Sequence, residues 1–182
     1  MHMISFQKKK ETGKTKCRVI GFAAVPDSMH VLLPVIYLIF AAFFVHDTQA
    51  TERSAQAYVR TYKAIALSKS NEYSIPYKVI LGIAIVESGS GQSRTARELN
   101  NHFGIVGQNS LKRKTRYRQY GDVKESYDHF CRVLTRKTFY SSLKSTRNHE
   151  LWIRAISRTG YSEMPSIWEK RVLGVIEDIK TL

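Results

Sequence analysis

A single glutamate, Glu87, closes an apolar segment of the chain and is the residue best suited to do chemistry. The preceding segment, Val79–Val86, is almost wholly apolar, and on a helix Glu87 shares a face with Ile80, Ile83 and Ala84. Burial and the negative end of the helix macrodipole both disfavour a carboxylate, so the carboxyl pKa is expected to be raised. A carboxyl that stays protonated near neutral pH can act as a general acid, as the proton donor of a glycosidase does.

The alternative interpretation of Glu87 is a solvated residue whose aliphatic stem covers part of the core. Four nearby glycines favour catalysis, because backbone without side chains lets a bulky ligand approach. These glycines are Gly89, Gly91, Gly104 and Gly107. They also fit ordinary turns, with Gly89 ending the helix.

The motifs around and after Glu87 resemble, in order and spacing, the glucosaminidase domains of bacterial autolysins and flagellar peptidoglycan hydrolases, glycoside hydrolase family 73. The family pattern is a Pro-initiated apolar helix ending in Glu-Ser-Gly, then Asn-Asn-x-Phe-Gly-Ile, an aromatic-rich hairpin, a Ser-led helix and Gly-Tyr-x-x-x-Pro. The matching segments are Pro76, Glu87–Ser93, Asn100–Ile105, Tyr117–Tyr120, Glu125–Tyr127, and Gly160–Tyr161 with Pro165. The resemblance extends over Tyr62–Ile179.

This resemblance implies an α+β fold, mostly α: a lysozyme-like two-lobed domain with a small β-hairpin lobe and a cleft between the lobes. It also implies roles for individual residues. Glu87 becomes the catalytic proton donor, and the substrate-binding residues become Asn101, Phe103, Gly104 and Tyr161.

The chain departs from the family pattern in two places. Ser90 stands where an aromatic residue usually follows Glu-Ser-Gly, which removes a platform for a sugar ring. The family commonly has a second carboxylate after Phe-Gly-Ile, yet residues 99–121 contain no Asp or Glu.

A second catalytic group is nevertheless needed for a two-carboxylate glycosidase. Asp122 is the nearest downstream acid and the first candidate, followed by Glu125 and by Glu98 on the other side. Asp122 could instead be a helix N-cap. A third route needs no second acid, because the acetamido group of the substrate can attack the anomeric carbon.

Residues 1–50 are interpreted as a basic tail and an apolar export signal or membrane anchor, and residues 51–182 as the glucosaminidase domain. The uncharged run Val31–Val45 has the length of a signal h-region and follows a basic stretch. Thr48-Gln49-Ala50 offers a cleavage site. The positive-inside rule places everything after Ala50 outside the cytoplasm, so a periplasmic or cell-wall-facing location is expected, with possible membrane anchoring through Val31–Val45.

The chain after Ala50 is strongly basic, with 23 Lys and Arg against 12 Asp and Glu. Such a surface attracts polyanions. The run Lys112–Arg118, with Tyr117 and Tyr120, would fit nucleic acid, or it is only a solvated tip. For an exported protein the nearer polyanion is the cell wall, so peptidoglycan glycan strands are the expected partner and nucleic acid is not.

Neither a cofactor nor a metal is expected, because the histidines lack metal-ligand spacing and Cys131 lies among apolar residues of a helical stretch.

Periodicity predicts mostly helices. The expected elements are a helix with Tyr58, Tyr62 and Ile65 on one face that ends near Asn71, a helix from Pro76, a hairpin of Phe103–Val106 with Thr115–Gln119, a helix from Asp122 or Ser126 to Leu134, a helix with Trp152 and Ile156, and a last helix with Ile167, Val172, Val175, Ile176 and Ile179.

The sequence therefore predicts an exported peptidoglycan hydrolase that cleaves the β-1,4 glycan strand as an endo-β-N-acetylglucosaminidase. One alternative is a lytic transglycosylase or lysozyme-type muramidase, although the Gly-Leu-Met-Gln segment usual in such transglycosylases is absent. The other is a non-catalytic basic module that binds wall glycan or nucleic acid.

Overall fold

The computed structural model describes residues 52–112 and 115–180, which belong to one compact unit, Val45–Leu182. The predicted export segment and the predicted domain boundary after Ala50 lie outside the described residues. Within the described part, no helix combines the length and the apolar character needed to cross a membrane.

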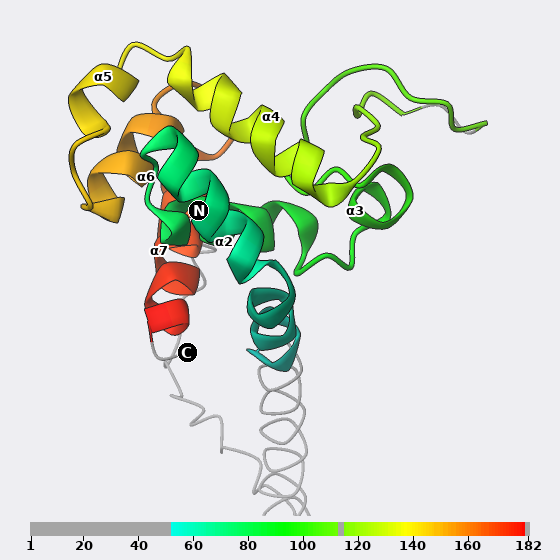
Figure 1. The fold of residues 1–182 in the computed structure, drawn as a ribbon, viewed down its shortest axis with the longest axis horizontal. Helices are drawn as coiled ribbons and strands as arrows, with labels where there is room; N and C mark the ends of the chain where they lie inside the picture. Colours follow the sequence, from blue (N-terminus) through cyan, green and yellow to red (C-terminus); the bar gives the residue numbers. More distant parts are fainter. Residues whose placement is uncertain (1–51, 113–114, 181–182) are drawn as a thin grey trace, which may run out of the picture. The chain divides into compact units, whose positions relative to one another are not determined.

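The described residues are mostly helical, as the sequence predicts (Figure 1). Residues 52–73 are helical, and the helices that follow are α2 (Tyr77–Ser88), α3 (Arg94–Leu99), α4 (Val123–Thr135), α5 (Tyr140–Leu143), α6 (His149–Ser157) and α7 (Pro165–Lys180).

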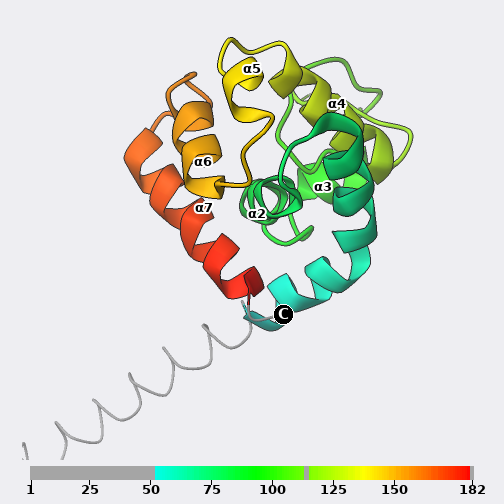
Figure 2. The same cartoon turned by 60° about the vertical axis from the view of Figure 1, so that its left-hand side comes forward.

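Helix α2 is the centre of the core. Every residue from Val79 to Ile85 is buried, so the helix needs neighbours on all sides, and Figure 2 shows it end-on with the other helices around it. Helices α6 and α7 both pack on it. Gly82 permits the close approach of α7, because a Cβ there would lie 2.7 Å from Ile176 Cγ1.

The end of α2 is fixed by local signals. Gly89 adopts a left-handed conformation (φ 56°) and its N–H donates to the carbonyl of Ile85, as a C-cap glycine does. Ser93 then begins α3, since its side chain accepts from the N–H of Ala96. These two caps place Glu87 in the last turn of α2, one residue before its end.

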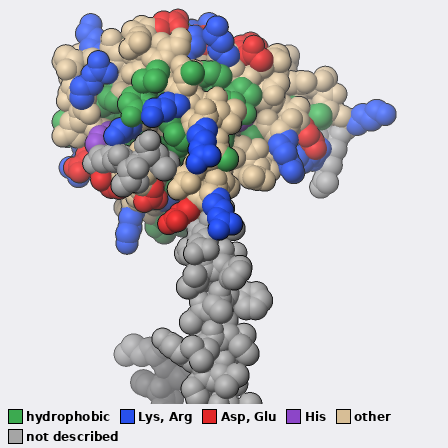
Figure 3. Space-filling view, turned by 60° about the horizontal axis from the view of Figure 1, so that its bottom comes forward, with side chains coloured by type: hydrophobic (Ala, Val, Ile, Leu, Met, Phe, Trp, Pro, Cys, Tyr) green, Lys and Arg blue, Asp and Glu red, His purple; other side chains and the backbone are tan. Residues whose placement is uncertain are grey.

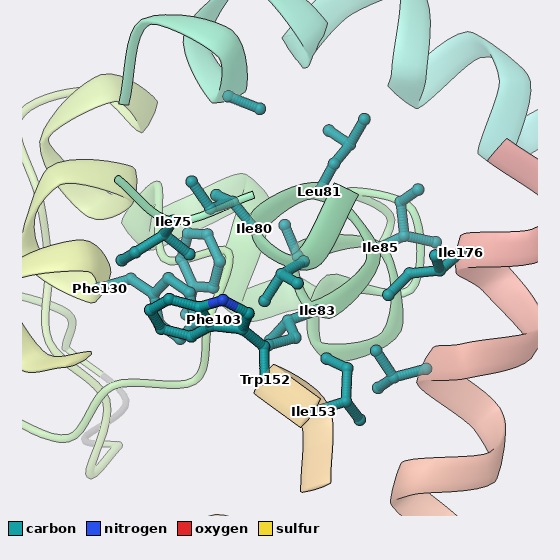
Figure 4. Packing of buried hydrophobic residues seen from close by; sticks show 14 of the residues in the cluster. Ile75, Ile80, Leu81, Ile83, Ile85, Phe103, Phe130, Trp152, Ile153 and Ile176 are labelled. Carbon is teal, nitrogen blue, oxygen red and sulfur yellow. The ribbon is translucent and has the colours of Figure 1, made fainter. Parts of the chain in front are cut away.

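The loop after α3 is anchored to α4 by aromatic packing. The Phe103 ring stacks on Phe130 with centroids 4.1 Å apart and meets Tyr127 edge-on at 4.9 Å. Figure 4 shows Phe103 and Phe130 side by side in the core, close to Ile75. This packing fixes the backbone of the residues that follow Phe103.

The predicted β-hairpin lobe differs from the structure. Among the described residues of this loop, pairing is reduced to one isolated antiparallel bridge, Val106 with Tyr117. Backbone hydrogen bonds flank this bridge, from the N–H of Gly107 to the carbonyl of Arg116 at 2.9 Å and from the N–H of Arg118 to the carbonyl of Ile105 at 2.8 Å. Beyond the bridge a side-chain amide joins the segment, because Asn109 Nδ2 donates to the carbonyls of Thr115 and Tyr117, both at 2.8 Å. The predicted partners therefore meet through a short stretch of backbone pairing supported by side-chain amides, without forming two regular strands.

The buried face of α7 also differs from the prediction. Ile167, predicted on its buried face, is 62% exposed, whereas Trp168 is 7% exposed and packs in the core. Trp168, Val172 and Ile176 are four residues apart and share one helix face. The buried stripe is therefore rotated by one residue from the predicted one at the start of the helix.

A buried ion network joins the helix of residues 52–73 to α4. Lys69 is 6% exposed, and its Nζ lies 2.6 Å from Asp128 Oδ1 and 2.7 Å from Glu72 Oε2. The Tyr73 hydroxyl donates to the same Asp128 oxygen at 2.9 Å. These partners satisfy a lysine that would be costly to bury alone.

Candidate active site

The carboxyl group of Glu87 is half-buried, and one of its oxygens is bound. Trp168 Nε1 donates to Glu87 Oε1 at 2.7 Å, a contact between residues 81 positions apart. Burial raises the pKa of Glu87, while the Trp168 hydrogen bond and the charge of Arg171 act in the opposite direction. The net effect is a carboxyl that holds its proton to higher pH than an ordinary glutamate.

Gly104 lies opposite the other oxygen of Glu87. A Cβ on Gly104 would be 3.7 Å from Glu87 Oε2 and 3.8 Å from Tyr117 Cε1. Gly104 also has a left-handed backbone (φ 64°), which side chains rarely adopt. Bare backbone therefore borders the oxygen that Trp168 leaves unoccupied.

Tyr161 completes the surroundings of Glu87. Its hydroxyl donates to the carbonyl of Phe103 at 3.1 Å, and its ring contacts Trp168 with centroids 5.2 Å apart. Burial and the negative charge of Glu87 raise the pKa of Tyr161 well above its usual value, so the phenol stays neutral. Tyr161 thus ties the loop of Gly104 to Trp168 of α7, the residue that binds Glu87.

Two residues predicted to bind substrate are buried beneath this loop. Asn101 Nδ2 donates to the carbonyls of Ile105 and Arg118, both at 2.8 Å, and Asn101 Oδ1 accepts from the N–H of Ile105. Phe103 is 2% exposed within the aromatic core. Of the four predicted substrate-binding residues, the structure places Gly104 next to Glu87 and Tyr161 against Trp168, whereas Asn101 and Phe103 shape the loop from below.

The candidate second acids are engaged elsewhere. Asp122 is exposed and caps α4, because its Oδ1 accepts from the N–H of Glu125 at 2.7 Å. Glu125 in turn accepts from the N–H of Gly121 at 2.9 Å, which completes a capping arrangement. Glu98 pairs with Arg94 within α3 at 2.7 Å. Within the described residues, no carboxylate is among the groups that shift the pKa of Glu87.

A buried polar cluster lies under the start of the same loop. The Tyr58 hydroxyl hydrogen-bonds to His102 Nδ1 and, at 2.9 Å, to the hydroxyl of Tyr127. Burial lowers the pKa of His102 to about 4, so the ring is neutral at neutral pH, and its backbone N–H donates to Ser126 Oγ. These contacts hold the loop between α3 and α4. In the part of the chain that the structure describes, no three His, Cys, Asp or Glu side chains gather as metal ligands would.

Trp168 is a site residue that was not predicted from the sequence. The sequence contains an indication that Trp168 is buried, because it precedes Val172 by four positions on the buried face of the last helix. A buried indole N–H needs an acceptor. Which acceptor it finds is decided by the packing of α7 against α2.

The family model of the glucosaminidases, described as mannosyl-glycoprotein endo-beta-N-acetylglucosaminidase, matches residues 63–181. The solved glycoside hydrolase domain of Salmonella typhimurium FlgJ is similar with a TM-score of 0.57 and 22% identity, over 70% of this chain and 89% of that chain. A C-terminally truncated form of that domain gives a TM-score of 0.58 and 21% identity, over 70% and 99% of the two chains.

A structure of a type VI secretion system effector-immunity complex from Pseudomonas protegens is also similar. Its TM-score is 0.54 at 22% identity, over 70% of this chain and 94% of that chain. A sequence search of curated proteins found no match. At these identities, the solved structures establish a shared fold.

Proposed function

Because the chain belongs to the glucosaminidase family, which confirms the resemblance of its motifs, we propose that it is a peptidoglycan hydrolase that acts as an endo-β-N-acetylglucosaminidase. One observation carries the proposal. The half-buried Glu87 has one oxygen held by Trp168, and its other oxygen faces the bare backbone of Gly104. A carboxyl with a raised pKa and one accessible oxygen is suited to protonate the leaving oxygen of a glycosidic bond.

The reaction begins with proton transfer from Glu87 to the glycosidic oxygen as the bond to the anomeric carbon breaks. The indole of Trp168 occupies Oε1, so the proton is carried by Oε2, on the side of Gly104. Tyr161 fixes the loop of Gly104 through the carbonyl of Phe103. The carboxylate left on Glu87 then serves as the base that activates water.

The group that attacks the anomeric carbon is proposed to be the substrate's own acetamido oxygen. Asp122 and Glu125 are engaged in capping α4 and are exposed. In the substrate-assisted route, the acetamido oxygen forms a bond to the anomeric carbon as the leaving group departs. Water then opens this cyclic intermediate, giving its proton to Glu87 and restoring the acetamido group.

The test is digestion of purified peptidoglycan, with mass spectrometry of the new reducing ends. We expect a reducing end on GlcNAc. A reducing end on MurNAc, or an anhydro product, would instead identify a muramidase or a lytic transglycosylase.

Glu87→Gln should fold normally, because a neutral amide oxygen still accepts from Trp168, and should lose roughly 10²- to 10⁴-fold in turnover. Asp122→Asn is the matched comparison, because Asn caps a helix about as well as Asp and should leave turnover nearly unchanged. An active Glu87→Gln protein would refute the proton-donor role. A stable but inactive Asp122→Asn protein would refute the substrate-assisted route.

We further propose that the domain acts outside the cytoplasm, facing the cell wall, with Val31–Val45 as the export signal or anchor. The basic tail before this apolar run supports that orientation. Sequencing the N-terminus of the protein recovered from the cell envelope would distinguish a cleaved signal from a retained anchor.

A further inference from the structure

Three arginines from two parts of the fold gather around one histidine. Arg118 comes from the loop before α4, and Arg132 and Arg136 come from α4 and its C-cap. The Arg118 guanidinium lies over the Tyr120 ring, 5.7 Å from its centroid, and the Tyr120 hydroxyl hydrogen-bonds to His129 Nδ1 at 2.7 Å. All three arginines are exposed. We call Arg118, Arg132 and Arg136 the arginine cluster.

The arginine cluster carries more positive charge than the ion pair of Arg132 with Asp128 neutralises. Burial lowers the pKa of His129, and the three arginines lower it further, with only Asp128 opposing them. Asp128 is itself bound by Lys69 at 2.6 Å and Tyr73 at 2.9 Å, as well as by Arg132 at 3.1 Å. Among the ion pairs of the described residues, none involves Arg118 or Arg136.

The arginine cluster is connected to the active site through the loop between α3 and α4. Asn101 Nδ2 donates to the carbonyls of both Ile105 and Arg118, each at 2.8 Å. The loop that carries Arg118 also carries Gly104. The N–H of Arg118 donates to the carbonyl of Ile105, the residue after Gly104, at 2.8 Å. A polymer bound at Glu87 would therefore have the arginine cluster close beside it.

We propose that the arginine cluster is a binding site for the free carboxylates of the peptide stems that peptidoglycan carries along its glycan. This inference rests on the proposed function of the Glu87 site. Guanidinium groups bind carboxylates through paired hydrogen bonds, and stems are attached to the same strand that Glu87 would cleave. On the face that Figure 3 shows, basic and acidic side chains are interspersed.

If the arginine cluster binds stems, the preferred substrate is glycan that carries peptide stems rather than denuded glycan, from which the stems have been removed. The experiment compares hydrolysis of sacculi free of phosphate polymers with hydrolysis of the same material after an amidase has removed the stems. The full chain should cleave the stem-bearing material about tenfold faster at low substrate concentration, since each exposed ion pair contributes a few-fold. This preference should shrink with added salt.

The variant is Arg118→Gln with Arg132→Gln and Arg136→Gln. It should lose the preference and cleave both materials at the rate that the wild type shows on denuded glycan. A control with the same loss of charge replaces three exposed basic residues outside the cluster, Arg60, Lys144 and Lys170, each with Gln. The control should keep the preference.

Equal rates of the wild type on both materials, or equal rates of the two triple variants on stem-bearing material, would overturn the proposal. A binding measurement tests the arginine cluster as a stem-binding site without relying on hydrolysis. Soluble stem-bearing glycan fragments are titrated into Glu87→Gln protein, with and without the cluster substitutions, by calorimetry. A loss of about tenfold in affinity supports the site, and unchanged affinity overturns it, as does tighter binding of a single-stranded oligonucleotide than of the fragments.

Different results would refute the proposed function and the proposed stem-binding site. If the wild type cleaves neither material, the hydrolase assignment fails, and the calorimetric result alone decides the stem site. If it cleaves both materials equally, the hydrolase assignment stands and the stem site fails.

Discussion

Replacing Gly104 with alanine should obstruct the proton donor at a small cost in stability. The left-handed backbone of Gly104 (φ 64°) costs an alanine about 1 kcal/mol. The added Cβ would meet Glu87 Oε2 at 3.7 Å and Tyr117 Cε1 at 3.8 Å, both ordinary contacts, so packing adds no further cost. For a domain of this size, the thermal midpoint should fall by roughly 4 °C.

The effect of Gly104→Ala on activity should be much larger than its effect on stability. A glycosidic oxygen must come within roughly 3 Å of Glu87 Oε2 to receive the proton, and the new methyl group stands in that space. A displacement of about 1 Å in a reacting group can lower the rate about 10²-fold. We therefore expect a loss of turnover of about that size, measured as release of soluble fragments from purified peptidoglycan.

Gly89→Ala is the matched control. Gly89 has nearly the same backbone (φ 56°), but a Cβ there would have no heavy atom within 4 Å. Gly160→Ala, with φ 73° and the same open surroundings, is a second control farther along the chain from Glu87. The controls should lose similar stability in thermal unfolding and keep their activity. If Gly104→Ala is as active as the controls, Glu87 Oε2 is not the oxygen that meets the substrate.

Two further predictions concern the contacts of Trp168 and Asp128. Trp168→Phe keeps an aromatic ring but removes the hydrogen bond that lowers the pKa of Glu87, so the fall in activity at alkaline pH should move to higher pH, as kcat/KM profiles would record. Asp128→Asn should lower the free energy of unfolding by about 2 kcal/mol or more, because Lys69 keeps only Glu72 as a carboxylate partner. Burial alone would raise the pKa of Asp128, but its bonds to Lys69 and Tyr73 lower it overall, so this stabilisation is present above about pH 4 and is lost as the pH falls below that.

An alkaline limb that stays in place in Trp168→Phe would contradict the role given to the indole hydrogen bond. For Asp128, the comparison is acid unfolding of the wild type and of Asp128→Asn. The difference in stability between them should narrow as the pH falls below about 4. A constant difference would show that Asp128 acts through packing rather than charge.

Local features of the fold could be predicted from the sequence. The central position of α2 follows from its continuous apolar residues, and its end follows from Gly89. The cap at Asp122 follows from an acid placed just before a helical pattern. Such signals are readable because capping and periodicity act within one or two helical turns.

The extent of the hairpin could not be predicted, because side-chain amides and backbone N–H groups share the hydrogen bonding of that loop. Alternating residues indicated two strands, but the side chains of Asn101 and Asn109 bind four backbone carbonyls of the loop. Only the bridge between Val106 and Tyr117 remains among the described residues there. Alternation predicts which residues face each other, and it does not predict how far the backbone ladder extends before side-chain bonds take over.

By itself, the sequence determined the family, the predominance of helix and the position of Glu87 on a buried helix face. The tertiary structure decided what surrounds the carboxyl. The indole of Trp168 and the bare backbone of Gly104 meet at Glu87, and Tyr161 contacts both Trp168 and the loop of Gly104. These residues come from distant parts of the chain, and no local pattern encodes their meeting. The reason is physical: helix and turn signals come from contacts a few residues apart, whereas the environment that sets the pKa of a carboxyl comes from whichever elements pack against it.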